Sequence, residues 1–396
     1  MKEKNRILST VCIYHALNDG SVVAIPILFP VLKSLFSLNY TQIGIITGGG
    51  LILTLIAQLL IGRIADGKNF ATLLTTGLLL VGISMLLLTQ SSDFFTLVVF
   101  ILVLRLASSF FHPVGVGWVS RIFKRDRLDW AMGIQSGCAD IGAFIAISTT
   151  LYLTEMKGWS FPLYVWAMLC VIGVLIGVFL TQHLNDECVV VKKEEKKQNI
   201  KDAFIEGFQL VKKIKLLAPA FMISGSAWGV TITYLPLLLS ERTSLSLPLI
   251  GVLVAVWIGI GSIASFSYGR IASLLGRKRV ILCCYLTMGV MGFFLTYFTN
   301  IIVLIGIMLL LGVSTFLTYP ALFSIISEAT HESVEGRTFG IIFTLQLSGG
   351  TALLFFGGVL ADIFGIWIPF AILGALSFIL ASMLIINYRK PMVAST

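Results

Sequence analysis

Three ionisable residues lie well inside long apolar stretches of the chain: Asp19, Arg105 and Asp140. An ionisable group in hydrocarbon costs several kcal/mol unless it faces a cavity or a partner, so it is by default a functional candidate. Two carboxylates and one guanidinium form a set whose net charge changes when one acid takes a proton. We predict that this set couples proton binding to solute movement. The alternative is a static Asp–Arg pair that holds two helices together, which would need only one acid.

Two histidines extend this set. His15 lies one helical turn before Asp19 and on the same helix face, with Asn18 beside them. His112 follows Arg105 by seven residues, and Ser108 and Ser109 between them complete a polar stripe along the same predicted helix. Both imidazoles can titrate near neutrality, although a histidine bonded to a carbonyl of a neighbouring helix is an equally good structural explanation. We predict that His15 takes part in proton coupling and that His112 and Asn18 contact the solute.

Arg105 has two candidate roles, which the sequence leaves open. The guanidinium can clamp an anionic solute through paired hydrogen bonds. It can also hold Asp19 deprotonated, because a nearby cation favours the charged form of a carboxyl group.

The elements that must position these residues are transmembrane helices. Hydrophobic residues make up 57% of the 396 residues and charged residues only 12%, well below the quarter or so that is typical of soluble domains. The apolar residues form stretches of about 20, long enough for a helix to cross a bilayer. The sequence predicts an all-α integral membrane protein with twelve transmembrane helices, at residues 7–32, 41–62, 70–90, 94–120, 130–153, 162–184, 215–240, 247–270, 279–297, 300–326, 338–361 and 367–388.

Basic residues predict the orientation of these helices. Of the 28 Lys and Arg, only Lys33, Lys157 and Arg242 fall in odd-numbered loops and Arg105 lies inside a helix, so the other 24 lie at the termini and in even-numbered loops. The positive-inside rule then places both termini in the cytoplasm of a multi-pass cell-membrane protein. The net charge of +9 is thus a topology signal, and no nucleic acid partner is expected.

An internal repeat divides the chain into halves. A shift of 207 residues lays Gly62-Arg63-Ile64-Ala65 onto Gly269-Arg270-Ile271-Ala272, and it pairs Pro113 with Pro320 and Gly142 with Gly349. Between the halves lies the longest polar segment. We predict an N-terminal bundle of six helices (residues 1–184), a cytoplasmic linker with a short amphipathic helix near residues 204–211 (residues 185–214) and a C-terminal bundle of six helices (residues 215–396). Two parallel repeats of six helices are the architecture of major facilitator transporters.

The predicted second bundle has no charge at mid-membrane depth and offers aromatic side chains instead. Trp257 and Tyr319 are candidates for solute contact, and Tyr319 occupies the repeat position of His112. Most aromatic residues in such helices serve packing or the interfacial belt. We therefore expect proton chemistry in the first half and recognition of shape in the second.

The chain resembles the major facilitator superfamily over essentially its whole length. The loop motif G-x-x-x-D-x-x-G-R-[KR] of that family is split between the repeats: GRIADGKNF keeps Asp66, whereas GRIASLLGRKR keeps the Gly-Arg-Lys end. The resemblance implies that helices 1 and 4 line a central cavity with helix 5 close by. It also implies a cytoplasmic latch, in which Asp66 pairs with a basic residue such as Arg121 or Arg337.

A narrower resemblance is to the fosmidomycin-resistance group of drug exporters. It is carried by His15-Ala-Leu-Asn18-Asp19, by FSLNYTQIG at the start of the second helix, and by Phe111-His112-Pro113. Members of that group have Glu after His-Pro, whereas this chain has Val114. The resemblance implies proton-driven export of a drug-like compound.

The sequence therefore predicts a proton/solute antiporter for a small, anionic or amphiphilic compound, acting as a monomer in the bilayer without a cofactor. An uptake symporter for a small organic anion is the alternative, since the same charges would serve it. A membrane-embedded enzyme that uses His15, Asp19 or His112 as acid and base is a remote alternative, because no metal-type spacing, nucleophile elbow or phosphate loop is present.

Overall fold

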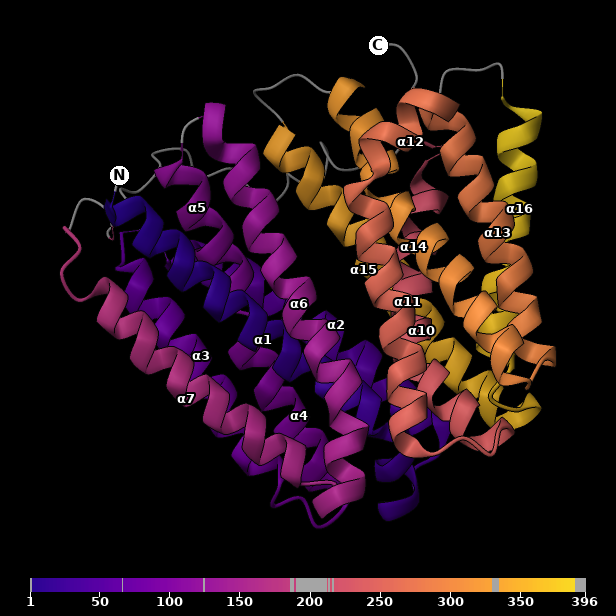
Figure 1. The fold of residues 1–396 in the computed structure, drawn as a ribbon, viewed down its shortest axis with the longest axis horizontal. Helices are drawn as coiled ribbons and strands as arrows, with labels where there is room; N and C mark the ends of the chain where they lie inside the picture. Colours follow the sequence, from indigo (N-terminus) through magenta and orange to yellow (C-terminus); the bar gives the residue numbers. More distant parts are fainter. Residues whose placement is uncertain are drawn as a thin grey trace. The chain divides into compact units, whose positions relative to one another are not determined.

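The computed structural model describes residues 2–65, 67–123, 125–185, 189, 212, 214–215, 217–329 and 335–388. Its regular elements are helices (Figure 1). In the first half of the chain these are α1 (Lys2–Leu35), α2 (Tyr40–Ile64), α3 (Phe70–Leu88), α4 (Phe94–Ser108), the π-helix η1 (His112–Val116), α5 (Gly117–Ile122), α6 (Arg125–Lys157) and α7 (Phe161–Thr181). In the second half they are α10 (Ala218–Arg242), α11 (Leu247–Phe266), α12 (Tyr268–Leu275), α13 (Arg277–Tyr297), α14 (Ile301–Ala329), α15 (Glu335–Phe364) and α16 (Ile368–Ile386).

Twelve helical segments in the described ranges are long and apolar enough to cross a membrane, which confirms the predicted fold class. The fourth is composite, since α4, η1 and α5 together form one span from Phe94 to Ile122. Large apolar side chains such as Leu175, Phe179 and Ile302 are exposed along these helices. Soluble proteins rarely expose apolar surface on this scale, so these faces suit contact with lipid. The predicted linker, residues 185–214, lies almost wholly outside the described residues, including its predicted amphipathic helix.

The same helix pairs form in both halves of the chain. In the first half α1 packs against α6, and α3 packs between α4 and α7. In the second half α10 packs against α15, and α13 packs between α14 and α16. These helices are equivalent at the repeat spacing of 207 residues, so each repeat builds the same bundle.

A repeated glycine explains the closest of these pairs. A Cβ on Gly142 of α6 would lie 2.0 Å from the carbonyl oxygen of Ala16 in α1. At the repeat position, a Cβ on Gly349 of α15 would lie 2.2 Å from the carbonyl oxygen of Met222 in α10. Small residues of this kind let membrane helices approach at backbone distance.

We expect Gly142→Ala to destabilise the folded protein, because the new methyl group has no room against the backbone of α1. Overpacking of this kind costs about 1–3 kcal/mol. Thermal unfolding of the detergent-solubilised variant, followed by tryptophan fluorescence, should show a melting temperature several degrees lower. Gly133→Ala is the matched control on the same helix, since its new Cβ would meet no atom of the described residues within 4 Å apart from the adjacent backbone of its own helix. Equal melting temperatures for the two variants would contradict this account of the α1–α6 contact.

The chain forms two compact units that do not follow the repeat boundary alone. Unit 1 comprises Met1–Leu38, Gly49–Glu195 and Ser246–Val252, whereas unit 2 comprises Asn39–Gly48, Lys196–Leu245 and Leu253–Thr396. The beginning of α2 thus belongs to unit 2 and the beginning of α11 to unit 1. Within unit 2, a Cβ on Gly44 would lie 2.5 Å from the carbonyl oxygen of Leu354. Within unit 1, a Cβ on Gly251 would lie 3.0 Å from that of Ile147.

Asp362 of α15 holds the first residues of α2 in unit 2. Its two carboxylate oxygens accept hydrogen bonds of 2.8 Å from the backbone N–H groups of Tyr40 and Thr41. The hydroxyl of Tyr40 donates to Glu241 of α10. A carboxylate at a helix N-terminus satisfies N–H groups that have no intrahelical partner and complements the positive end of the helix dipole. Asp362 therefore caps α2 from a helix that lies far away in the sequence.

Candidate functional site

Three side chains converge in unit 1: His15 and Asp19 from α1, and His112 from the first residue of η1. One ligand atom from each residue lies within 4.8 Å of the others. His15 and Asp19 meet because they are one turn apart on a helix, and the Nε2 atom of His15 lies 3.4 Å from Oδ2 of Asp19. The rings of His15 and His112 meet edge to face, with centroids 5.4 Å apart.

A break in helical geometry presents His112. Helix α4 ends at Ser108, and the chain resumes as a π-helix at His112, immediately before Pro113. Proline has no backbone N–H and clashes with the preceding turn, so it interrupts the α-helical hydrogen-bond pattern. The hydroxyls of Ser108 and Ser109 both donate to the carbonyl oxygen of Arg105. Short π-helical segments within helices are frequent at functional sites.

His15 is buried and fixed in orientation by its surroundings. Its Nδ1 atom lies 2.9 Å from the carbonyl oxygen of Gln135 in α6. Because a carbonyl only accepts hydrogen bonds, we assign the proton of the neutral ring to Nδ1. The ring also stacks on Phe111 at a centroid distance of 4.1 Å. In this tautomer Nε2 directs its lone pair toward Asp19, and Nε2 has no hydrogen-bond partner in the described part of the chain.

Asp19 is half-buried and contacts His15 and Asn18. The side-chain amide of Asn18 donates a 2.9 Å hydrogen bond to Oδ1 of Asp19. Two acceptor atoms, Nε2 of His15 and Oδ2 of Asp19, therefore face each other across 3.4 Å. Lone pairs at this distance repel unless a cation lies between them, and a proton is the smallest such cation. The facing atoms of His15 and Asp19 are therefore arranged to bind one cation between them.

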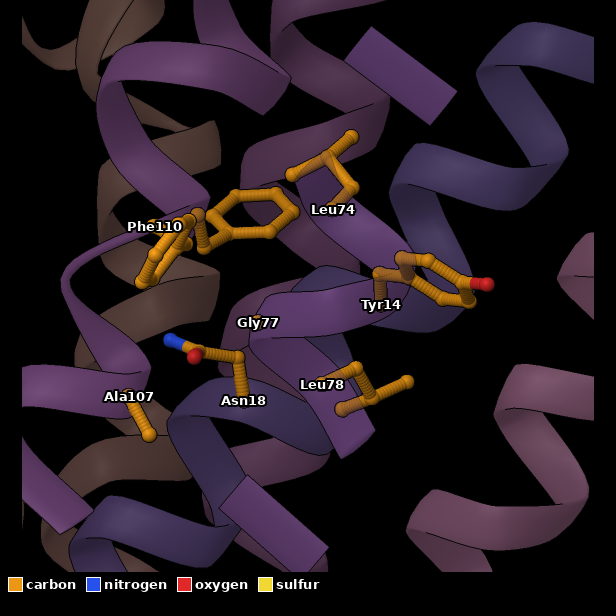
Figure 2. A pocket seen from close by; sticks show the side chains of 8 residues that line it. Tyr14, Asn18, Leu74, Gly77, Leu78, Ala107 and Phe110 are labelled. Atoms are coloured by element: carbon orange, nitrogen blue, oxygen red, sulfur yellow. The ribbon is translucent and has the colours of Figure 1, made fainter. Parts of the chain in front are cut away.

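A small cavity adjoins Asn18 (Figure 2). Its volume is about 10 Å³, and Tyr14, Leu74 and Phe110 are among the side chains that line it. That volume is just large enough for one water molecule. The hydroxyl of Tyr14 is already paired with Thr75 at 3.0 Å. A solute larger than water does not fit in this cavity.

Arg105 of α4 is half-buried and lies against α2. Its Nε atom is 3.1 Å from the point where a Cβ on Gly50 would sit, so this glycine makes room for the guanidinium. Arg105 interacts electrostatically with Asp19 at longer range. Among the described side chains, Asp19 makes its close contacts with His15 and Asn18 rather than with Arg105.

Asp140 lies on α6, five residues after the Gln135 carbonyl that binds His15. Its side chain is half-buried. It does not belong to the group of ligand atoms within 4.8 Å that His15, Asp19 and His112 form in the described part of the chain. The two predicted acids therefore occupy different surroundings.

The aromatic candidates of the second half lie together in unit 2. Trp257 of α11 is fully buried and meets the ring of Phe316 edge to face at 5.2 Å. Tyr319 of α14 lies 6.4 Å from the same ring, and its hydroxyl donates to the carbonyl oxygen of Ser224 at 3.4 Å. The indole Nε1 of Trp257 has no hydrogen-bond partner among the described residues. Because Trp257 is fully buried, a ligand could reach this N–H only if the packing around the ring changed.

Little of the predicted cytoplasmic latch falls within the described residues. Asp66 and the side chain of Arg337 lie outside them. Arg121 is exposed, and its guanidinium lies over the ring of Phe70 at 5.5 Å.

Sequence patterns gave no indication of two features near these sites. The carbonyl of Gln135 is a backbone group, so no residue type marks its bond to His15. Asp362 resembles any acid near a helix end, and only the fold brings it to Tyr40 and Thr41.

Comparison with known proteins gives consistent matches along the whole chain. The family profile of the Major Facilitator Superfamily matches residues 11–351 and, separately, residues 217–395. The uncharacterized MFS-type transporter YfnC of Bacillus subtilis is 25% identical over 397 residues, which cover 95% of this chain and 93% of that protein. An uncharacterized MFS-type transporter of Methanocaldococcus jannaschii is 23% identical, covering 92% of this chain and 93% of that protein. Among solved structures, a bacterial homolog of the human lysosomal transporter Spinster superposes with a TM-score of 0.80 at 13% identity, covering 99% of both chains.

Proposed function

Since the chain belongs to the major facilitator superfamily, a family of membrane transporters, we propose that it exports a small solute across the cell membrane in exchange for protons. Its motifs around His15, Asn18, Asp19 and His112 resemble those of the fosmidomycin-resistance drug exporters. This resemblance supports a drug-like compound as the solute.

The pairing of His15 with Asp19 is the observation that carries the proposal. Nε2 of His15 and Oδ2 of Asp19 face each other at 3.4 Å and suit one bound proton. Loss of that proton would leave a carboxylate and a lone pair in repulsion, so the empty and protonated states favour different arrangements of this part of the protein. Differential stability of two conformations is what coupling requires.

Solute recognition would divide between charge and shape. In unit 1, Arg105, the exposed ring of His112 and the amide of Asn18 offer donors to an anionic group. In unit 2, the half-buried ring of Tyr319 offers aromatic surface, and the buried Trp257 carries an indole N–H that has no partner among the described residues. Unit 1 thus offers contacts for an anionic group, and unit 2 offers contacts for an apolar or aromatic group.

Purified protein in liposomes with an imposed proton gradient tests the proposal. A pH-sensitive dye inside the liposomes reports proton flux while candidate solutes are screened. Antiport predicts that protons and solute cross in opposite directions. Flux in the same direction would identify an uptake symporter for a small organic anion, the alternative that the same charges would serve.

We predict that both termini and the 185–214 linker are cytoplasmic, because 24 of the 28 basic residues lie on that side. In a background without native cysteines, a membrane-impermeant thiol reagent applied to intact cells should label Lys157→Cys and leave Glu195→Cys unlabelled. Permeabilised cells provide the control, since both positions should then react. Labelling of position 195 alone in intact cells would reverse the orientation.

A further inference from the structure

We propose that His15, Asp19 and His112 form a binding site for a divalent transition metal ion of the Zn²⁺ class. This site shares residues with the proposed proton exchange, but metal binding does not require that transport be proton-driven.

Ligand spacing is the first argument. Nε2 of His15 and Oδ2 of Asp19 are 3.4 Å apart. Two ligands of a tetrahedral ion with bonds of roughly 2.0–2.1 Å are separated by about 3.3 Å, so this pair already has the required spacing. The ligand atom of His112 lies within 4.8 Å of both and would need to move by at most about 1.5 Å, which a rotation of its side chain can supply.

The outer contacts of the ligands are the second argument. Metal-bound histidines usually donate their other ring N–H to a carbonyl or a carboxylate, which fixes the tautomer and the orientation of the ring. His15 does this through Nδ1 and the carbonyl of Gln135 at 2.9 Å. Asp19 is oriented in the same way by the amide of Asn18, which occupies Oδ1 and leaves Oδ2 for the ion.

An unsatisfied buried atom is the third argument. The side chain of His15 is only 6% exposed, yet its Nε2 atom has no hydrogen-bond partner among the described residues and is aimed at Asp19. A buried polar atom without a partner is costly. A metal ion would satisfy Nε2 and the facing carboxylate oxygen together.

The donor set selects the kind of ion. Two imidazoles and one carboxylate suit Zn²⁺, Co²⁺ or Ni²⁺, whereas Mg²⁺ and Ca²⁺ prefer oxygen ligands. Three protein ligands leave a fourth position for water or for an acidic group of a solute. His112 is exposed, so an ion can reach the cluster. Sequence spacing did not predict this site, because His112 lies on a separate helix and 97 residues beyond His15.

Binding of Co²⁺ to the full-length protein in detergent tests the proposal. Four-coordinate Co²⁺ should give visible absorption bands that saturate at one equivalent and disappear when Zn²⁺ is added, whereas Mg²⁺ should leave them unchanged. His15→Ala, Asp19→Asn and His112→Ala should each weaken Co²⁺ binding at least about tenfold, because even outer-shell changes cost 10–100-fold in metal affinity.

Matched controls separate this site from other ligands in the chain. His183→Ala removes an exposed histidine beyond the end of α7 and should leave Co²⁺ binding unchanged. Cys12→Ser and Cys138→Ser test the two thiols that contact each other between α1 and α6, and these variants should also bind normally. His112 is exposed, so its alanine variant remains informative if His15→Ala fails to fold.

Absence of saturable Co²⁺ bands, or bands that persist in His112→Ala, would overturn the metal site. Loss of the bands in either cysteine variant would also overturn it, by assigning the metal to thiolates. The results of the Co²⁺ titration are independent of proton coupling, because coupling is measured by proton flux in metal-free liposomes. Failure of that flux with intact Co²⁺ binding would reject the proposed antiport and leave the metal site standing.

Discussion

Asp19→Asn should abolish proton-driven accumulation of solute while leaving downhill exchange measurable. The amide cannot carry a proton between two states, yet it has nearly the same shape and can still accept a hydrogen bond from Asn18. In liposomes, the rate of gradient-driven transport should fall by about 100-fold or more, the scale on which loss of an essential proton carrier acts. Counterflow of labelled against unlabelled solute, which needs no net proton movement, should persist.

Two further carboxylate variants control for this result. Asp140→Asn removes the second of the two acids that the sequence places near the middle of the membrane, and this acid lies outside the group of His15, Asp19 and His112 in the described part of the chain. We expect a smaller effect from it, because Asp19 has the histidine partner. Asp93→Asn removes an exposed acid that caps α4, and it should leave coupling unchanged. Full proton-driven transport in both Asp19→Asn and Asp140→Asn would show that these charges are structural and would refute the coupling mechanism.

Arg105→Ala should be more damaging still, eliminating both gradient-driven transport and counterflow. The substitution removes a half-buried positive charge that offsets Asp19 at long range, and it removes the guanidinium that we propose to contact an anionic solute. Leaving one member of a charge set without compensation inside a membrane costs several kcal/mol, which corresponds to a loss of about 100-fold or more in the competent population.

Arg105→Lys separates the two roles of this residue. Lysine keeps the positive charge but cannot form the planar, paired hydrogen bonds of a guanidinium. Recovery of gradient-driven transport with the original solute affinity would assign Arg105 to charge compensation alone. Recovery of counterflow only at much higher solute concentration would assign it to solute binding. Arg105→Ala with unchanged counterflow and unchanged gradient-driven transport would exclude both roles.

The sequence predicted the fold well because a bilayer leaves few choices. Backbone polar groups in hydrocarbon must bond within their own segment, so each apolar stretch of sufficient length becomes a helix. The predicted span of residues 94–120 ran through Pro113 without interruption, and the π-helix at His112–Val116 was not predicted. The sequence did not predict that the beginning of α2 belongs to unit 2 and the beginning of α11 to unit 1. Hydropathy does not tell which bundle a helix end packs against.

The sequence predicted the contact between candidate site residues on the same helix. It did not predict which side chains of different helices meet. His15 and Asp19 are four residues apart, and a helix brings such residues together without further help. Whether Asp19 would contact Arg105 or a histidine depends on how α1 and α4 are rotated about their axes. That rotation is set by packing contacts such as those of Gly50 and Gly142, which no periodicity reveals.

The two glycine contacts that join helix beginnings to the neighbouring repeat have an evolutionary consequence. Gly44 packs on Leu354 and Gly251 packs on Ile147, and the shift of 207 residues converts the first contact into the second. A six-helix ancestor that carried only one such glycine and one such partner would form both contacts at once by pairing with a copy of itself, as an isologous dimer does. Gene duplication and fusion would then have kept both contacts within a single chain. Two separately expressed halves of this protein should accordingly recover function only when they are produced together.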